Sequence, residues 1–283
     1  MGEAVLKIVF SEECLGYGSP YHPENPLRVK LAYEYLRDRY DFIEARPAEE
    51  ADILLVHEPE YVEKIKRGDF HDPDTPAYEG IYEYARLSAG GAIIAAEELA
   101  FSLMRPPGHH AGRRGLALGA PTLGFCYFNN IAIAVRKKGK RTLIVDIDTH
   151  HGNGTQEIFQ GCEDVVYISL HTWGIYPGTG YRSSGNCYNY PLPPGTDDEL
   201  YLKTLRKALS VIDPSDFELV AVSAGFDTLK GDLGGMRLTV GCYREIGKLI
   251  ASLGLPVFAV LEGGYTSKLG ECIDNFIRGL EEG

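Results

Sequence analysis

The stretch Thr142–Thr155 reads TLIVDIDTHHGNGT, and it decides how the rest of the chain is interpreted. Its first residues are apolar and mostly β-branched, which predicts a buried strand that ends near Asp146. Side chains alternate along a strand, so Asp146, Asp148 and His150 are expected on one face. Carboxylates and imidazoles are common metal ligands, and a buried cluster of them would be costly without a cation. The stretch therefore predicts part of a catalytic metal centre.

The composition describes a globular protein with ample material for a core, since 44% of its 283 residues are hydrophobic and 24% are charged. No apolar run reaches the roughly 18 to 20 residues that a membrane span needs. The opening MGEAVLKIVF lacks the layout of a signal peptide. Six cysteines without a C-x-x-C pair argue against a disulfide framework and against a cysteine zinc site. These observations favour a cytoplasmic protein with no membrane partner.

The formal net charge of −12 argues against direct nucleic-acid binding, because that function needs a basic surface. An acidic protein can attract a cationic substrate, but the same charge can also do no more than keep a protein soluble. Composition alone leaves both interpretations open.

Apolar runs of strand length alternate with amphipathic, helix-length patterns along the chain. The expected strands are Val5–Phe10, Ile53–Val56, Phe101–Met104, Thr142–Asp146, Val165–Ser169, Leu219–Ser223 and Val257–Leu261. The expected helices are Pro26–Arg39, Tyr61–Lys66, Gly80–Ala100, Ile131–Lys138, Asp197–Val211, Thr239–Ser252 and Leu269–Leu280. Such alternation is typical of an α/β fold with a largely parallel sheet and helices on both faces. No repeat or flexible linker interrupts it, so residues 1–283 are expected to form one domain.

Polar or glycine-rich motifs follow the ends of five of these strands. They are Arg105–Ala111, Asp146–Gly154, His171–Gly180, Ala224–Gly235 and Glu262–Tyr265. Open α/β sheets bind ligands in the crevice outside the carboxyl ends of their strands. We therefore expect the five motifs to converge on one site.

These motifs, in this order, resemble those of the histone deacetylase family, which includes acetylpolyamine amidohydrolases and acetoin-utilisation proteins. The matching segments are RPPGHHA (105–111), GFCYFNN (124–130), DIDTHHGNG (146–154), YPGTG (176–180), AGFD (224–227) and EGGY (262–265). The resemblance is collinear from about residue 10 to residue 280 and is closest to class II-like members. It implies the arginase/deacetylase fold, an open, mainly parallel sheet of eight strands with helices on both faces. It also implies one zinc-dependent catalytic domain over 1–283.

By this resemblance, Asp148, His150 and Asp227 hold the catalytic metal. Two carboxylates and one imidazole leave a zinc site open for water and a substrate carbonyl. The same donors could hold Fe²⁺ or Co²⁺. Taken alone, Asp227 would be interpreted as a helix N-cap that follows a strand.

The resemblance gives the histidine doublet a role in proton transfer. Amide hydrolysis needs a base for water and an acid for the leaving amine, and one imidazole can serve as both. His110 matches that group, and His109 matches an electrostatic partner that Asp146 orients. Asn153 stands against His110, where some members of the family carry Asp. A neutral Asn should leave the pKa of His110 lower than an Asp would.

Other positions match groups that contact the substrate. The phenol of Tyr265 corresponds to the hydrogen-bond donor for the developing oxyanion. Phe125 and Tyr176 correspond to two aromatic walls around an extended aliphatic chain. Gly124 precedes Phe125 in the same substrate-binding loop. Arg28 matches an arginine that lines the family's internal acetate pocket. Asp74 matches a carboxylate at the rim of the site.

The family also binds a monovalent cation, usually K⁺, beneath the catalytic site. Oxygen-rich coordination suits such a hard cation. The matching positions are Asp146, Asp148, His150, Ser169 and Leu170.

The predicted activity is removal of acetyl groups from acetyl-lysine-type amines, with acetylpolyamine deacetylation as the alternative. Leu233 or Gly234 stands where some polyamine-selective members carry an acidic gatekeeper, which weakens the polyamine alternative. A two-manganese ureohydrolase would need Asp-x-Asp, but Asp227-Thr228-Leu229 offers one carboxylate. A binding module without turnover would normally have lost a ligand, a histidine or the tyrosine. The expected partner is an acetylated lysine or amine, and the oligomeric state stays open.

Overall fold

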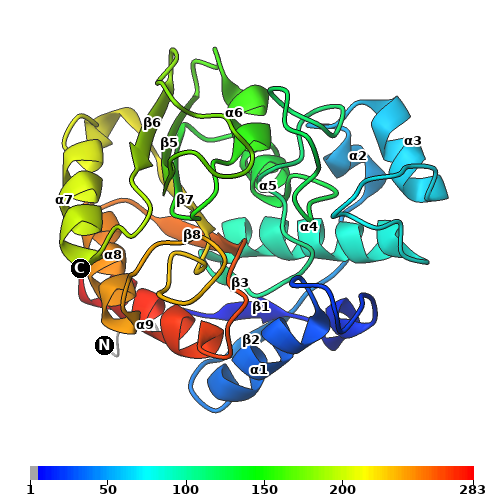
Figure 1. The fold of residues 1–283 in the computed structure, drawn as a ribbon, viewed down its shortest axis with the longest axis horizontal. Helices are drawn as coiled ribbons and strands as arrows, with labels where there is room; N and C mark the ends of the chain where they lie inside the picture. The colour runs from blue at the N-terminus through cyan, green and yellow to red at the C-terminus, as the bar shows by residue number, and fades with distance from the viewer. Residues whose placement is uncertain (1–5) are drawn as a thin grey trace.

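Residues 6–283 are described by a computed structural model, in which eight parallel strands form one open sheet (Figure 1). The strand order is β2-β1-β3-β8-β7-β4-β5-β6. The strands are β1 (Ile8–Phe10), β2 (Phe42–Glu44), β3 (Phe101–Ser102), β4 (Thr142–Asp146), β5 (Val165–Thr172), β6 (Cys187–Leu192), β7 (Leu219–Ala224) and β8 (Val257–Leu261). Since all pairs are parallel, every strand presents its carboxyl end at the same edge of the sheet.

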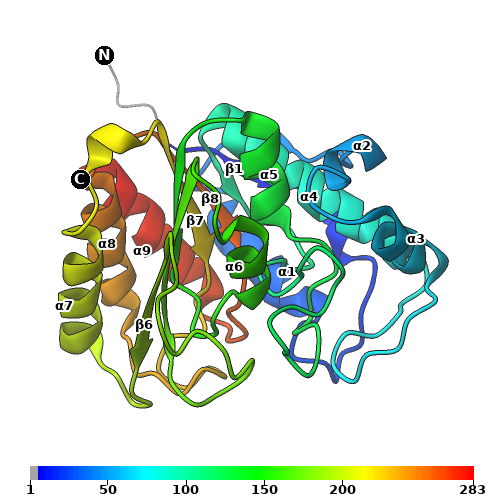
Figure 2. The ribbon, with the colours of Figure 1, turned by 90° about the horizontal axis from the view of Figure 1, so that it is seen from above.

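Helices cover both faces of this sheet (Figure 2). One face carries α1 (Pro26–Leu36), α7 (Asp198–Leu209), α8 (Val240–Ala251) and α9 (Leu269–Glu282). The other carries α2 (Glu50–Ile53), α3 (Pro59–Arg67), α4 (Ile81–Glu98), α5 (Asn130–Lys138) and α6 (Asn153–Phe159). Two short 3-10 helices, η1 (Glu12–Leu15) and η2 (Pro214–Asp216), lie in connections. The expected fold class is therefore confirmed.

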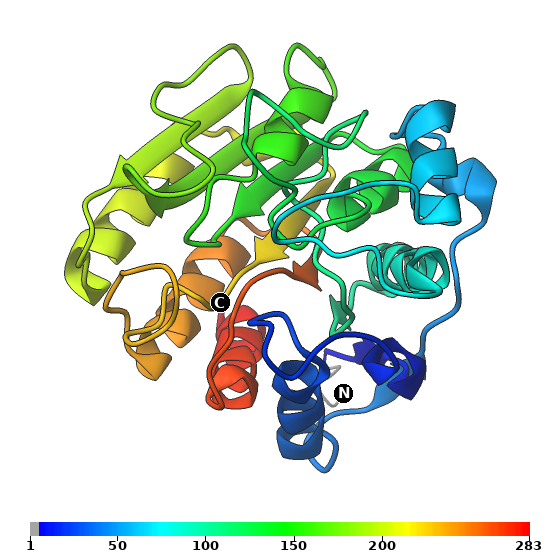
Figure 3. The same cartoon turned by 45° about the vertical axis from the view of Figure 1, so that its right-hand side comes forward.

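The central strands explain why the sheet needs two layers of helices. Every residue of β4 and of β7 is buried. Strands of a parallel sheet are covered on both faces, so they are apolar throughout and do not alternate between apolar and polar residues. The chain positions its polar groups beyond the ends of the strands, where Figure 3 shows the arrowheads of the central strands lying side by side. This edge carries the candidate site.

Three expectations about strands need correction. Ile53–Val56 is not a strand, because residues 50–53 form α2 and Leu54 and Leu55 are exposed. A four-residue apolar run fits a helix end as well as a strand, and here Asp52 caps the helix by accepting a hydrogen bond from the backbone of Glu49 at 3.3 Å. The other two corrections are β2 and β6, which the sequence did not predict.

Both of these strands lie at edges of the sheet, where a neighbouring strand supplies the pairing that their own sequence does not signal. The expected strand Val5–Phe10 is found as Ile8–Phe10, and Val5 lies outside the described residues. The seven expected helices occur in their expected places, with ends that differ by a few residues, whereas α2 and α6 were not expected. Between residues 6 and 283, no helix combines the length and the apolar character that crossing a membrane requires.

Candidate metal centre and active site

Three side chains from two strand ends form a compact cluster of metal-ligand type. Asp148 and His150 follow β4, and Asp227 follows β7, the neighbour of β4 in the sheet. One ligand atom from each of the three residues lies within 4.8 Å of the other two. His150 Nδ1 is 3.0 Å from Asp148 Oδ1 and 3.0 Å from Asp227 Oδ2. The convergence that the sequence predicts is thus present for these three residues.

The reason for this convergence differs from the one expected. Strand β4 ends at Asp146, so Asp148 and His150 do not lie on one face of a strand with it. Their turn is instead held by hydrogen bonds from backbone N–H groups to side-chain carboxylates. Asp148 N donates to Asp146 Oδ1 at 3.1 Å, and His150 N donates to Asp148 Oδ1 at 2.8 Å. Asp146 points its second carboxylate oxygen elsewhere, toward His109.

The cluster has the electrostatic character of a cation site. Asp227 Oδ2 is buried and accepts no hydrogen bond from the described residues. Burial raises the pKa of Asp227, and the neighbouring carboxylate of Asp148 adds to the effect. Burial also opposes a charge on His150, but the two carboxylates outweigh it and raise its pKa to about 10. A divalent cation would neutralise both carboxylates, so this donor set fits a zinc-type ion.

Glycines allow the backbone to approach the cluster closely. A Cβ atom at Gly225 would lie 2.2 Å from Asp148 Oδ2, and one at Gly263 would lie 2.5 Å from Asp227 Oδ2. Gly263 N donates a hydrogen bond to Asp148 Oδ2 at 2.8 Å, which orients that carboxylate. The Glu-Gly-Gly-Tyr segment after β8 is therefore in direct contact with the candidate ligands.

The two histidines of the doublet have different partners. His109 Nδ1 lies 3.0 Å from Asp146 Oδ2, which also accepts a hydrogen bond from the Tyr167 hydroxyl at 2.8 Å. Burial disfavours the charged form of His109, but Asp146, Asp148 and Glu262 raise its pKa to about 10. The surrounding carboxylates therefore favour the charged form of His109, which lies beside the candidate ligands.

His110 is set up as a neutral imidazole. Its Nδ1 lies 2.7 Å from Asn153 Oδ1, and Asn153 Nδ2 donates to the carbonyl of Ala117 at 2.9 Å. Because the amide oxygen must accept, the proton of His110 is on Nδ1. Its Nε2 makes no hydrogen bond with the described part of the chain and can accept a proton. Burial, with His109 and His150 nearby, lowers the pKa of His110 well below its usual value.

Tyr265 lies in the segment that contacts the ligands. Its ring meets the ring of Phe125 edge to face, with centroids 5.9 Å apart, and its hydroxyl makes no hydrogen bond among residues 6–283. Tyr176 similarly stands edge-on to His110, with centroids 4.9 Å apart, and donates a hydrogen bond from its hydroxyl to the Thr122 carbonyl at 2.9 Å. The half-buried side chains of Phe125, Tyr176 and Tyr265 thus lie around the three candidate metal ligands and the histidine doublet.

The sequence of this chain matches a known protein family. The model of the family described as "Histone deacetylase domain" matches residues 22–280. The chain belongs to the histone deacetylase family. A "Probable deacetylase" of Archaeoglobus fulgidus is 38% identical, over 93% of this chain and 82% of that protein. A "Histone deacetylase-like amidohydrolase" of Pseudomonas aeruginosa is 34% identical, over 88% of this chain and 73% of that protein.

A solved structure shows the same fold. The crystal structure of the HDA15 HD domain superimposes with a TM-score of 0.89 at 32% sequence identity, covering 99% of this chain and 89% of that one. This match supports the arginase/deacetylase architecture that the sequence motifs implied. The chain therefore shares the fold of this domain.

Arg28 lies beneath the tyrosine segment of this histone deacetylase domain. The guanidinium donates from Nε to the Gly264 carbonyl at 2.7 Å and also donates to the Glu262 carbonyl. It stands over the Tyr265 ring at 4.9 Å from the centroid. The structure thus brings the expected acetate-pocket arginine into contact with the backbone that carries the tyrosine.

Asp74 belongs to the loop that supports the first aromatic wall. Its carboxylate accepts hydrogen bonds from Thr122 Oγ1 at 2.6 Å and from Gly124 N at 3.2 Å. Thr75 Oγ1 accepts a hydrogen bond from Phe125 N at 2.8 Å. Gly124 has a positive φ of 56°, and a Cβ atom there would lie 2.5 Å from the Tyr176 hydroxyl. The carboxylate of Asp74 therefore accepts its hydrogen bonds from the loop that carries the aromatic wall, and its role at the rim stays a prediction.

The positions expected to bind potassium lie at neighbouring strand ends. Ser169 of β5 stands opposite Asp146 of β4 in the parallel register, and Leu170 follows it in the core. Ser169 Oγ lies 2.9 Å from His171 Nδ1. Asp148 and His150 follow in the turn after β4. Three of the five positions therefore lie on two paired strands and two lie in the turn that follows one of them, and potassium binding stays a prediction.

Sequence reasoning did not single out two carboxylates that organise the site. Glu262 is fully buried and accepts hydrogen bonds from Gly108 N at 2.7 Å and His109 N at 3.1 Å, which fixes the turn before the histidine doublet. Asp232 contacts the backbone of Tyr265. Each lies inside a motif that the sequence highlighted, but nothing in the sequence shows which backbone groups they meet.

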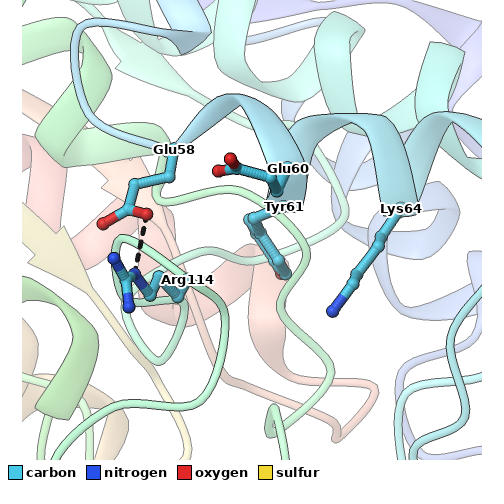
Figure 4. A pocket seen from close by; sticks show the side chains of 5 residues that line it. All are labelled: Glu58, Glu60, Tyr61, Lys64 and Arg114. Carbon is cyan, nitrogen blue, oxygen red and sulfur yellow. Dashed lines mark ion pairs between the residues drawn. The ribbon is translucent and has the colours of Figure 1, made fainter.

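A separate hollow of about 360 Å³ lies at the start of α3, lined by Glu58, Glu60, Tyr61, Lys64 and Arg114. Figure 4 shows Glu58 and Arg114 facing one another, 2.7 Å apart as an ion pair. Two carboxylates and two cations leave this hollow nearly neutral. It contains none of the residues that the sequence assigns to the site.

Proposed function

We propose that this protein is a metal-dependent deacetylase that hydrolyses the amide of acetyl-lysine-type amines and releases acetate. One observation carries the proposal above all. Asp148, His150 and Asp227 place their ligand atoms within 4.8 Å of one another, with one buried carboxylate oxygen that lacks a hydrogen-bond partner among the described residues. The membership of the histone deacetylase family, whose members typically use Zn²⁺, supports zinc as the ion.

The chain's own residues supply the proton transfers. Asp148, His150 and Asp227 would hold a divalent cation, which would supply Lewis acidity to the amide carbonyl and to an attacking water near neutral pH. His110 accepts a proton from water on Nε2 and passes it to the leaving amine, while Asn153 holds the proton on Nδ1. His109, which Asp146 holds in place, stabilises the negative charge that develops as the amide is attacked.

The tyrosine and the aromatic walls complete the proposed site. The Tyr265 hydroxyl donates a hydrogen bond to the oxyanion that forms from the carbonyl. Phe125 and Tyr176 contact the aliphatic arm of the substrate from two sides. Gly124, next to Phe125, belongs to the same substrate-binding loop. Arg28 lines the pocket for acetate, and Asp74 stands at the rim.

The substrate is proposed to be an acetyl-lysine-type amine, with an acetylated polyamine as the alternative. Leu233, which is 54% exposed after β7, offers no charge for a polyamine ammonium group. We also propose K⁺ at Asp146, Asp148, His150, Ser169 and Leu170, and a single catalytic domain over 1–283. The cysteine pattern supports a cytoplasmic location.

Acetate release from acetyl-lysine peptides and from acetylspermidine tests this proposal directly. The purified protein should contain about one equivalent of zinc, iron or cobalt, and a chelator should abolish turnover that added metal restores. Faster turnover of acetylspermidine would replace the proposed substrate class with acetylated polyamines.

The Asp227→Ala variant tests the ligand assignment. It removes one of three ligands, so both bound metal and turnover should be lost, and metal content can be measured without any assay of activity. Asp216→Ala, in η2, is the matched control and should keep both. Full activity of Asp227→Ala would remove Asp227 from the metal site.

A further inference from the structure

The loop after β7 reaches across to the tyrosine segment through one side chain, Asp232. Its Oδ2 accepts hydrogen bonds from the backbone N–H of Tyr265 at 2.8 Å and of Thr266 at 3.2 Å. Its Oδ1 accepts a hydrogen bond from Leu233 N at 2.7 Å. One half-buried carboxylate therefore joins the loops that follow two neighbouring strands, β7 and β8. Hydrogen bonds to an ionised acceptor are roughly twice as strong as neutral ones.

The tyrosine segment depends on such external contacts for its shape. Tyr265 follows two glycines, and Gly264 has a φ of 121°, so this part of the backbone has wide conformational freedom and no side chains that could anchor it. Arg28 holds the carbonyls of Glu262 and Gly264 on one side. Asp232 holds the two N–H groups on the other side, which include that of Tyr265 itself.

The loop that carries Asp232 is itself firmly held. Lys230 N donates to the Leu238 carbonyl at 2.9 Å, which closes the loop at its base. The Gly234 carbonyl accepts hydrogen bonds from Thr172 Oγ1 at 3.0 Å and from Thr149 Oγ1 at 3.2 Å. Thr149 lies between the two candidate ligands of the turn after β4. The loop that carries Asp232 is therefore hydrogen-bonded to the turn that holds two of the candidate metal ligands.

We propose that Asp232 is a positioning residue, which sets the direction of the Tyr265 hydroxyl by holding the backbone N–H groups of Tyr265 and Thr266. The inference rests on the proposed function, because it takes Tyr265 as the donor to the oxyanion. An aligned donor is effective only when its distance to the oxyanion is right, and misplacement by about 1 Å can cost on the order of a hundredfold in rate. Loss of Asp232 therefore lowers kcat, while substrate binding by Phe125 and Tyr176 continues.

A double-mutant cycle in the metal-loaded protein tests this role. Asp232→Ala should lower kcat about tenfold or more and change KM by less than about twofold, because only the transition state uses the tyrosine donor. In the Tyr265→Phe background, where the hydroxyl is absent, Asp232→Ala should have no further effect beyond about twofold. Asp232→Asn keeps one acceptor oxygen and should restore part of kcat; it also serves if Asp232→Ala does not fold.

Asp198→Ala is the matched control. The Asp198 carboxylate likewise accepts a backbone hydrogen bond across the chain, from Thr239 N at 2.8 Å, at the far end of the same connection. Its loss loosens that connection without touching Tyr265, so kcat should stay the same.

The outcomes separate the inference from the function on which it rests. A normal kcat in Asp232→Ala, or an equal loss of kcat in the Tyr265→Phe background, overturns the positioning role and leaves the deacetylase proposal intact. A normal kcat in Tyr265→Phe alone overturns the role of the tyrosine, and with it the inference. A fall in kcat that Asp198→Ala shares would also overturn the inference, because it would show a general loosening.

Discussion

At the scale of single residues, Asn153 decides the state of the proposed base. Its amide oxygen accepts from His110 Nδ1 and its amide nitrogen donates to the Ala117 carbonyl, so the side chain cannot turn without losing both contacts. The imidazole is therefore held with Nε2 free. A carboxylate at the same position would orient the ring equally well, but it would add a negative charge that favours the imidazolium.

We expect Asn153→Asp to raise the pKa of His110. The wild-type pKa lies well below its usual value because of burial and the neighbouring His109 and His150. Since the base must be neutral to accept a proton, the acidic limb of the kcat/KM–pH profile should move to higher pH by about one pH unit or more. Asn275→Asp on α9 adds the same charge far from His110 and should leave the profile where it is. An unchanged limb in Asn153→Asp would show that His110 is not the titrating base.

At the scale of elements, His57 joins three connections around the site. It lies between α2 and α3, and its Nδ1 donates to the Gly112 carbonyl at 2.9 Å, in the loop after the histidine doublet. Its Nε2 accepts from Asn129 N at 2.9 Å, at the start of α5. These two contacts need a neutral ring, because a protonated Nε2 cannot accept.

We expect the stability contribution of His57 to depend on pH. Burial lowers the pKa of His57 to about 3 in the folded protein, whereas an unfolded histidine titrates near about 6.5. The folded pKa is depressed, so this contribution is complete above pH 6.5 and is lost as the pH falls toward 3. Compared with His57→Gln, the wild type should lose roughly 1.4 kcal/mol of unfolding free energy per pH unit below 6.5.

Urea unfolding at pH 7 and at pH 5.5 measures this difference. The comparison with His57→Gln is needed because other groups also titrate, and they cancel between the two proteins. A difference that does not change between the two pH values would show that His57 can be protonated in the folded state.

At the scale of the whole molecule, a buried ion pair links the beginning of the chain to the site. Glu24 precedes α1, and its carboxylate accepts two hydrogen bonds at 2.7 Å from Arg105, in the connection after β3. Arg105 also donates to the carbonyls of Cys14 and Tyr17, and its side chain is fully buried. Glu24 lies 3.4 Å from Arg28, which holds the tyrosine segment. The pair therefore connects segments that are far apart in sequence.

We expect Glu24→Ala to destabilise the protein by about 3–5 kcal/mol, because it leaves the Arg105 charge buried without its partner. Urea unfolding measures the effect. Glu282→Ala breaks a solvent-exposed ion pair with Arg244, and the unfolding free energy should change much less. Equal effects of the two substitutions would show that Arg105 finds another partner or reaches water.

Local sequence patterns predicted those helices and strands whose own residues show a clear hydrophobic pattern. The strand Thr142–Asp146 is buried throughout and its centre, Leu143–Val145, is apolar because both faces of a parallel strand are covered. Helices α7 and α8 are amphipathic because each covers one face of the sheet. Patterns failed for β2 and β6, which pair at the edges of the sheet. They also failed at Ile53–Val56, where four apolar residues fit two kinds of element.

The sequence by itself determined the family, the parallel α/β fold and the residue types of the site, since these follow from motifs of a few adjacent residues. The tertiary structure decided which groups meet. Asp227 reaches Asp148 because β4 and β7 pair side by side, and Asp232 reaches Tyr265 because β7 pairs with β8. Contacts of this kind join residues that are distant in the chain, and pairing between strands brings them together. The stretch Thr142–Thr155 supplies two of the three candidate ligands, and the sheet supplies the third.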